Sequence, residues 1–212
     1  MSEIEIIGAP QSTFVRTLRM AMEEKGVSYK LTPARPHTPE VDAIHPFGKV
    51  PVMRHGDFTL CESKAIASYI DKAFPGPHLF PDDARLCGQI EQWISLINTA
   101  IQPSIIPYLR GYFFSQQPDG KPDHQMIEAA LPNVQANIAL LDRAVAKTGH
   151  LAGNGFTYAD MLALPILDYL KVCPESRDAI GMAKYLSTYF AIQAQRPSFI
   201  NTTPPPFSEL RR

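Results

Sequence analysis

The sequence contains few cysteines and no arrangement that would pair them. Cys61, Cys87 and Cys173 are the three cysteines among 212 residues, and no C-x-x-C pair is present. An odd number of widely spaced cysteines gives no disulfide framework. The cysteine content therefore favours a reducing environment.

A long apolar segment is also missing. No stretch of the sequence approaches the ~20 apolar residues that a membrane-spanning helix requires. The N-terminal residues Glu3 and Glu5 are acidic where a signal peptide would be basic. We expect a cytoplasmic protein that has no membrane partner.

Neither sign of charge is in excess. The chain has 20 Lys and Arg against 21 Asp and Glu, which gives a formal net charge of -1. Because a nucleic-acid-binding protein usually presents a basic face, this balance argues against nucleic acid as a partner. Apolar residues make up 45% of the chain and charged residues 19%, which is ordinary for a folded globular protein.

The N-terminal region alternates between strand and helix patterns. Residues 4–7 form a short apolar run that ends at a Gly-Ala-Pro turn, which predicts a buried strand. From Thr13 the apolar residues recur at helical spacing, and Gly26 stands where a helix C-cap glycine belongs. Residues 27–31 then predict a second strand, so the β-α-β order implies a parallel pair.

A second strand-rich segment completes this region. After a proline-rich loop over residues 33–48, residues 50–53 and 57–60 predict a hairpin, and a helix follows from about Glu62. We therefore predict a compact α/β domain over residues 1–75.

The rest of the chain has a helical pattern. Residues 76–82 are rich in proline and glycine and form the best candidate for a linker. Residues 83–212 then predict an all-α domain, with helices at 83–115, 123–147, 157–170 and 182–195. Thr157 and Asp160 have the spacing of a capping box.

The order of these elements resembles the soluble glutathione transferase superfamily, and so do several short motifs. The motifs are Gly8-Ala9-Pro10-Gln11-Ser12-Thr13-Phe14, His45-Pro46-Phe47-Gly48-Lys49-Val50-Pro51, Glu62-Ser63-Lys64-Ala65-Ile66, Thr157-x-x-Asp160 and Arg196-Pro197-Ser198-Phe199. They are similar above all to serine-type members, of the phi, tau, theta-like and bacterial kinds. The resemblance implies an N-terminal thioredoxin-like domain (βαβ, ββα) followed by an all-helical C-terminal domain.

Glu62 and Ser63 stand at the predicted start of a helix. A helix N-terminus exposes unpaired N–H groups and the positive end of the helix dipole, which suits a carboxylate. The resemblance implies that Ser63 binds the γ-glutamyl carboxylate of glutathione and that Glu62 pairs with its ammonium. The alternative is that both residues only favour the start of a helix.

The loop before residue 52 supplies the other implied contacts with glutathione. The resemblance implies a cis bond between Val50 and Pro51, which presents the Val50 backbone to the cysteinyl part of glutathione; a trans proline at a strand edge is the alternative. Lys49 and His37 are implied contacts of the glycyl carboxylate, with a merely solvated Lys49 as the alternative.

Ser12 is the implied catalytic residue. Its hydroxyl would donate a hydrogen bond to the glutathione sulfur and so lower the pKa of that thiol. Two alternatives remain: Ser12 serves only as a helix N-cap, or the neighbouring Thr13 faces the thiol. No cysteine lies near Ser12, and the first tyrosine is Tyr29, so the cysteine and tyrosine types of site are not indicated.

The resemblance implies a detoxification enzyme that transfers the glutathione sulfur to a small hydrophobic electrophile, with no metal and no cofactor beyond glutathione. Alternatives are a glutathione-dependent peroxidase or isomerase, or a non-catalytic relative that binds a ligand or a protein. It also implies a homodimer, with Phe47 as an aromatic key, and an electrophile pocket near aromatic residues such as Tyr108 and Tyr112.

Overall fold

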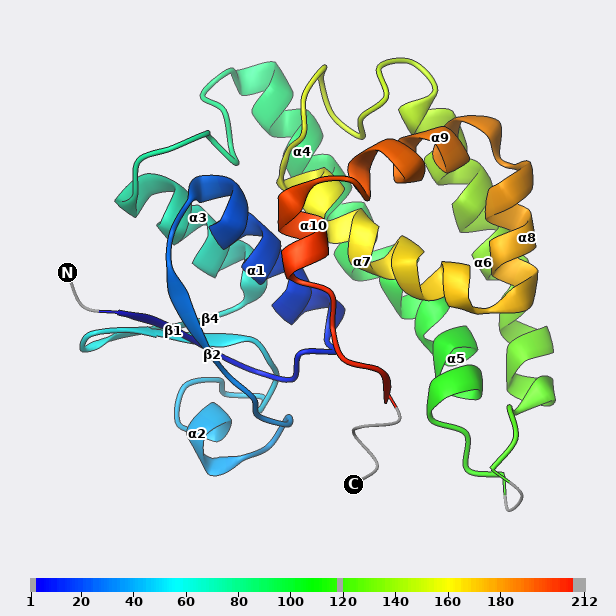
Figure 1. Ribbon diagram of the computed structural model, residues 1–212, viewed down its shortest axis with the longest axis horizontal. Helices are drawn as coiled ribbons and strands as arrows, with labels where there is room; N and C mark the ends of the chain where they lie inside the picture. The colour runs from blue at the N-terminus through cyan, green and yellow to red at the C-terminus, as the bar shows by residue number, and fades with distance from the viewer. Residues whose placement is uncertain (1–2, 118–119, 208–212) are drawn as a thin grey trace. The chain divides into compact units, whose positions relative to one another are not determined.

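A computed structural model describes residues 3–117 and 120–207 of the chain (Figure 1). These residues divide into two compact units. The first unit consists of residues 3–81 together with residues 195–207, and the second unit consists of the described residues between 82 and 194.

The first unit is built on a four-stranded sheet with the order β2-β1-β3-β4. Its strands are β1 (Ile4–Ile7), β2 (Tyr29–Thr32), β3 (Val52–His55) and β4 (Phe58–Cys61). β1 pairs with β2 in parallel and with β3 antiparallel, and β3 and β4 form an antiparallel hairpin. The predicted parallel pair and hairpin are confirmed. β3 begins at Val52 and not at Val50, since Pro51 has no N–H to donate to a strand ladder.

Helices cover both faces of this sheet. α1 (Thr13–Lys25) and α3 (Ser63–Ala73) lie on one face and α2 (Pro39–Asp42) on the other (Figure 1). The apolar stripe of α1 is buried from Val15 onward, while Phe14 is half-buried. Gly26 ends the helix in the left-handed conformation with φ 68, as the sequence predicts. On the opposite face, Val41 of α2 packs against Ile7 and Val52.

Residues 195–207 belong to the first unit, and part of this segment packs on α1. Two guanidinium nitrogens of Arg196 donate to the Glu24 carboxylate at 2.8 and 2.7 Å. The Arg16 guanidinium lies 4.1 Å from the centre of the Phe199 ring and donates to the Phe199 carbonyl. Both contacts involve the segment around α10 (Pro197–Asn201). The all-α domain predicted over residues 83–212 therefore ends earlier, because these contacts hold residues 195–207 on α1.

The predicted linker is fastened to the first unit by a buried carboxylate. Asp71 accepts hydrogen bonds from the backbone N–H groups of Leu79 and Phe80, at 2.8 and 3.2 Å. The same carboxylate pairs with the buried ammonium of Lys25 at 3.1 Å. A buried charge needs such partners. The Lys25–Asp71 ion pair and the hydrogen bonds of Asp71 therefore fix the position of the linker.

The described part of the second unit is helical. Its helices are α4 (Ala84–Leu96), the π-helical turn η1 (Ile97–Ile101), α5 (Gln102–Phe113), α6 (His124–Val145), α7 (Tyr158–Val172), α8 (Pro174–Met182) and α9 (Lys184–Gln193). The helix predicted over 83–115 is interrupted by η1. α8 is missing from the sequence prediction because it buries only Ser176 and Ile180 and so carries no apolar stripe. Within residues 3–117 and 120–207, no helix has both the length and the apolar character needed to cross a membrane.

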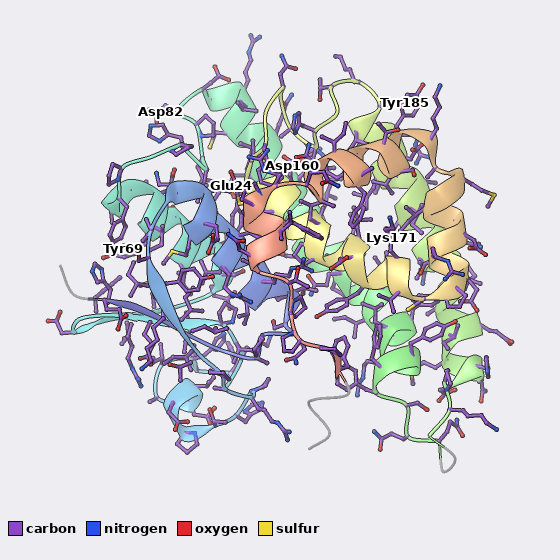
Figure 2. The ribbon with its side chains drawn as sticks, viewed as in Figure 1. Glu24, Tyr69, Asp82, Asp160, Lys171 and Tyr185 are labelled. Atoms are coloured by element: carbon purple, nitrogen blue, oxygen red, sulfur yellow. The ribbon has the colours of Figure 1, made fainter. Side chains whose placement is uncertain are left out.

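α7 forms the centre of the second unit and starts at the predicted capping box, which is confirmed. The Asp160 carboxylate, labelled in Figure 2, is fully buried. It accepts hydrogen bonds from the Leu151 N–H, the Thr157 N–H and the Tyr189 hydroxyl, at 3.0, 2.9 and 3.0 Å. Burial raises the pKa of Asp160, and these hydrogen bonds oppose that shift. One side chain thus joins a loop, a helix start and α9.

A second polar cluster joins α5 to α8. The Tyr112 and Tyr108 hydroxyls both donate to Oε2 of Glu175, at 2.5 and 3.0 Å. The Tyr112 hydrogen bond is the largest cause of a lowered pKa of Glu175, while burial raises the pKa of Tyr108 to about 12. Tyr108 is fully buried, so it packs in the interior and does not line an open pocket.

We expect Asp160→Ala to lower the free energy of unfolding by about 3–5 kcal/mol, since it leaves several buried donors without an acceptor. Urea unfolding followed by circular dichroism measures the loss. Asp178→Ala is the control, because this carboxylate is exposed on α8 and its removal should change stability by less than about 0.5 kcal/mol. Equal stability of the two variants would contradict the assigned role.

Glu175→Gln tests the pH dependence that follows from the lowered pKa. The folded protein releases this proton more readily than the unfolded chain, whose pKa is about 4.3. The stabilisation that the ionised Glu175 carboxylate contributes is therefore fully present above the unfolded pKa. It is lost as the pH falls through the pKa of Glu175 in the folded protein. Since Glu175 is half-buried, we expect Glu175→Gln to be less stable by about 1 kcal/mol at pH 7.

The stability difference between Glu175→Gln and the wild type should narrow below about pH 4. Urea midpoints between pH 3 and pH 7 measure it. Glu128→Gln, at an exposed position of α6, is the control. A difference that stays constant with pH would show that the charge of Glu175 contributes nothing.

Candidate functional site

The pairing of the strands brings the predicted site segments to one end of the sheet. Ile7 is paired with both Thr32 and Val52, and Val52 is paired with Cys61. At this end, therefore, the chain leaves β1 towards Ser12, enters β3 from Pro51 and leaves β4 at Glu62. The long loop that carries His37 and Lys49 starts at the same end of β2.

Gly8 lies where three of these segments approach one another. A Cβ atom at this position would lie 2.6 Å from Cγ2 of Val15 on α1, 3.1 Å from Cβ of Val50 and 3.5 Å from Cα of Pro51. The absence of a side chain thus allows the end of β1, the first turn of α1 and the residues before β3 to pack closely. This contact holds the Ser12 segment beside Val50.

Ser12 is half-buried and is the N-cap residue of α1, with φ −66 and ψ 128. Its hydroxyl oxygen accepts a hydrogen bond from the Val15 N–H at 3.4 Å. The cap uses a lone pair of the oxygen and not the hydroxyl proton. The capping role and a donor role towards a ligand are therefore compatible. Thr13 is also half-buried and begins the helix itself.

The Val50–Pro51 peptide bond is cis, the isomer that the resemblance implies. Val50 is half-buried and packs beside the cluster of Ile7, Val41 and Val52. The Val50 side chain thus holds the backbone before β3 against the sheet. Proline at this position leaves the strand ladder to begin one residue later.

Lys49 and His37 are brought together by the loop between β2 and β3. The His37 N–H donates to the carbonyl of Gly48 at 2.9 Å, directly before Lys49. Both side chains are exposed, and Nδ1 of His37 lies 3.6 Å from the Asp42 carboxylate. Two basic side chains are thus available at this corner for an anionic group.

Glu62 and Ser63 occupy the start of α3 as predicted. Ser63 is buried and is the first helical residue, while Glu62 is the N-cap with φ 69 and ψ 114. A positive φ is costly for a residue other than glycine. The Glu62 side chain does not cap the helix and is 70% exposed. The carboxylate of Glu62 therefore extends to solvent at the positive end of α3.

His45 is a residue that the sequence analysis includes only as part of a motif. It is 3% exposed, and its Nε2 atom lies 3.4 Å from Oε1 of Glu62. Its other ring nitrogen, Nδ1, accepts a hydrogen bond from the Phe47 N–H at 3.1 Å. No local pattern marks this residue, because its partner lies on a different element of the fold.

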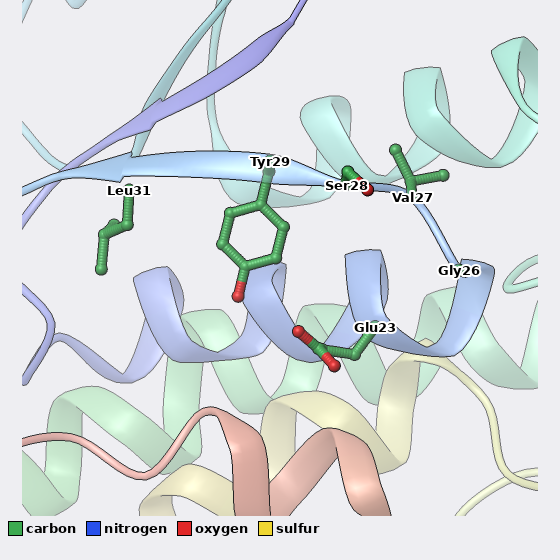
Figure 3. Close-up of a pocket in the computed structure, with 6 residues that line it drawn as sticks. All are labelled: Glu23, Gly26, Val27, Ser28, Tyr29 and Leu31. Carbon is green, nitrogen blue, oxygen red and sulfur yellow. The ribbon is translucent and has the colours of Figure 1, made fainter.

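A pocket elsewhere in the first unit contains none of the predicted site residues. It has a volume of about 460 Å³ and lies beside β2 at the end of α1, lined by Glu23, Gly26, Val27, Ser28, Tyr29 and Leu31 (Figure 3). The Tyr29 hydroxyl accepts a hydrogen bond from Arg19 at 3.2 Å. Among residues 3–117 and 120–207, no group of three or more His, Cys, Asp or Glu side chains could hold a metal ion.

Comparison with known protein families matches both parts of the chain. Residues 6–78 match the family described as "Glutathione S-transferase, N-terminal domain", and residues 99–189 match "Glutathione S-transferase, C-terminal domain". The first match contains every predicted site residue. The second match covers most of the second unit.

Curated relatives and solved structures agree with these matches. The chain is 29% identical to glutathione S-transferase F10 of Arabidopsis thaliana, over 77% of this chain and 80% of the relative. It is 26% identical to glutathione S-transferase 3 of Zea mays, over 98% and 99% of the two chains. The crystal structure of poplar glutathione transferase F1 is similar with a TM-score of 0.84 and 26% identity, over 100% of this chain and 99% of that one.

Gly8→Ala tests the close approach at this end of the sheet. The new methyl group would overlap Val15 and crowd Val50, so we expect a loss of about 1–3 kcal/mol in the free energy of unfolding. Gly88→Ala is the control, because a Cβ there meets nothing within 4 Å and alanine is the better helix former within α4. Gly88→Ala should keep or raise the urea midpoint. A Gly8→Ala variant as stable as wild type would contradict the close packing of Gly8 against Val15 and Val50.

Proposed function

Because this chain belongs to the glutathione S-transferase family, we propose that it binds glutathione as a thiolate and transfers the sulfur to small hydrophobic electrophiles. The observation that carries the assignment of the site is the convergence of the Ser12, Val50–Pro51 and Glu62–Ser63 segments at one end of the sheet. These are the residues that the family resemblance singles out.

The two ends of glutathione differ in charge, and the site offers a different group to each. The γ-glutamyl end carries a carboxylate and an ammonium. Ser63 and the N-terminus of α3 would hold the carboxylate, and the exposed carboxylate of Glu62 would pair with the ammonium. The glycyl end carries a second carboxylate, and Lys49 and His37 are the basic residues beside it in this proposal.

The middle of the tripeptide would bind to the backbone. The cis bond before Pro51 would turn the polar groups of Val50 towards the cysteinyl residue, which they would bind as a neighbouring strand does. A ligand held at three points along its length has little freedom left. Its sulfur would therefore be fixed relative to Ser12.

Ser12 would stabilise the charged form of the sulfur. The thiol releases its proton to water, and the Ser12 hydroxyl donates a hydrogen bond to the resulting thiolate, which lowers the pKa of the thiol. Each unit of lowering corresponds to about 1.4 kcal/mol. The thiolate then attacks an electrophilic carbon, a carbon–sulfur bond forms, and the leaving group departs with the displaced electron pair.

Several further features of the protein follow from the same proposal. We propose a cytoplasmic role in detoxification that needs no metal and no cofactor beyond glutathione. We also propose a homodimer in which Phe47 packs against the second subunit. In support, the Phe47 side chain is 70% exposed and is therefore accessible to a second subunit.

Ser12→Ala should retain glutathione binding and lose the thiolate. Removal of a hydrogen bond to a charged sulfur is worth about 1.5–3 kcal/mol, so the pKa of the bound thiol should rise by about one to two units. The ultraviolet absorbance of the thiolate, titrated against pH with saturating glutathione, measures this shift. Turnover with an aryl halide should fall in parallel.

Two variants serve as controls for this experiment. Thr13→Ala should leave the absorbance unchanged, and the reverse pattern would assign the donor to Thr13. Ser63→Ala should weaken glutathione binding and leave the pKa of the bound thiol as in wild type. A wild-type protein that binds glutathione without a thiolate signal would favour a non-catalytic carrier, and a thiolate that reduces peroxides but conjugates no electrophile would favour the peroxidase alternative.

A further inference from the structure

The carboxylate of Glu62 has one buried polar neighbour that the proposed glutathione site does not yet use. Nε2 of His45 lies 3.4 Å from Oε1 of Glu62, and the His45 side chain is 3% exposed while that of Glu62 is 70% exposed. The contact therefore joins a side chain that is fixed by burial to one that extends into solvent.

Two sets of hydrogen bonds fix the His45 ring and its protonated nitrogen. The His45 N–H donates to the Val41 carbonyl at 2.8 Å, and the His45 carbonyl accepts from the Gly48 N–H at 3.0 Å. The Phe47 N–H donates to Nδ1 at 3.1 Å. Because Nδ1 accepts this bond, the proton of the neutral ring is on Nε2, the atom that faces Glu62.

Glu62 has little else to hold its side chain in one direction. It is the N-cap of α3 but makes no side-chain cap, and its backbone has a positive φ of 69. An exposed glutamate loses up to about 2 kcal/mol of rotamer freedom when a ligand fixes it. A ring N–H fixed 3.4 Å from one oxygen favours one direction of the carboxylate and so lowers this cost, and the carboxylate keeps acceptor capacity for a second partner.

We infer that His45 is a positioning residue, which holds the Glu62 carboxylate in place for the ammonium of the γ-glutamyl group of glutathione. This inference rests on the proposed function. His45 itself does not touch glutathione in this scheme. His45 acts on binding at the amino end of the ligand and not on the sulfur. A substitution of His45 should therefore change KM for glutathione without changing the pKa of the bound thiol.

Two substitutions separate this role from a purely structural one. The side-chain amide of Asn replaces Nδ1 of His, so His45→Asn keeps an acceptor for the Phe47 N–H but cannot reach Glu62. The longer side chain of Gln places its amide N–H near the position of Nε2, so His45→Gln keeps the donor to Glu62 and loses the Nδ1 acceptor. A positioning role predicts that Gln replaces His45 better than Asn does. A role only in the loop predicts the reverse.

The experiment measures binding of two ligands to wild type, His45→Asn and His45→Gln by calorimetry. The ligands are glutathione and desamino-glutathione, in which hydrogen replaces the α-amino group. We expect His45→Asn to weaken glutathione binding about threefold to fivefold, as for the loss of an exposed ionic contact, and to leave desamino-glutathione binding unchanged. His45→Gln should bind both ligands within about twofold of wild type.

Kinetics and a double variant provide further readouts. His45→Asn should raise KM for glutathione while kcat and the pKa of the bound thiol stay at the wild-type values. In a Glu62→Ala background, His45→Asn should weaken binding no further, because the two residues act through one contact. Equal losses for both ligands, or a loss that persists without Glu62, would overturn the inference and assign His45 to the fold of the loop.

The test distinguishes the failure of this inference from the failure of the proposed function. If wild type binds glutathione and His45→Asn binds it equally well, the positioning role alone is overturned. If wild type binds no glutathione, the proposed function is overturned, and the role of His45 with it.

Discussion

The hydrogen-bonded register of four short strands is the constraint on which the candidate site depends. Each strand has only four residues, so a slip of one position would move a whole segment to the wrong level and reverse its faces. The pairs Ile7–Val52 and Val52–Cys61 fix the level at which Ser12, Pro51 and Ser63 leave the sheet. Gly8 then sets how closely these segments can approach. Backbone pairing thus determines the positions from which the side chains of the candidate site extend.

Local signals in the sequence were sufficient for the parts of the fold that depend on neighbouring residues. β1 and the left-handed Gly26 that ends α1 follow from periodicity and turn chemistry, and so does the capping box of Thr157 and Asp160. The strand β3 begins later than predicted because Pro51 cannot join the ladder. α8 was not predicted because its sequence shows no apolar stripe, and the hydrogen bonds of Glu175 with Tyr108 and Tyr112 join it to residues far away in the sequence.

Only some residues of the candidate site could be predicted, because residues that contact one another there are far apart in the sequence. Ser12, Glu62 and Ser63 each sit at a helix start, which sequence patterns can identify, and the family resemblance supplied their roles. His45 could not be identified in this way, because its significance arises only when β4 returns Glu62 to it. The position of residues 195–207 was missed for the same reason, since Arg196 and Glu24 are separated by most of the chain.

The attachment of α10 to α1 has a consequence for how the protein is made. Part of the surface of the helix that follows Ser12 is covered by residues translated after the second unit, among them Arg196, Phe199 and Thr202. While the ribosome is still synthesising the second unit, the emerging first unit must therefore exist with this surface uncovered. Its native packing can be completed only after residues 196–202 leave the exit tunnel, so the first unit reaches its final structure in two steps.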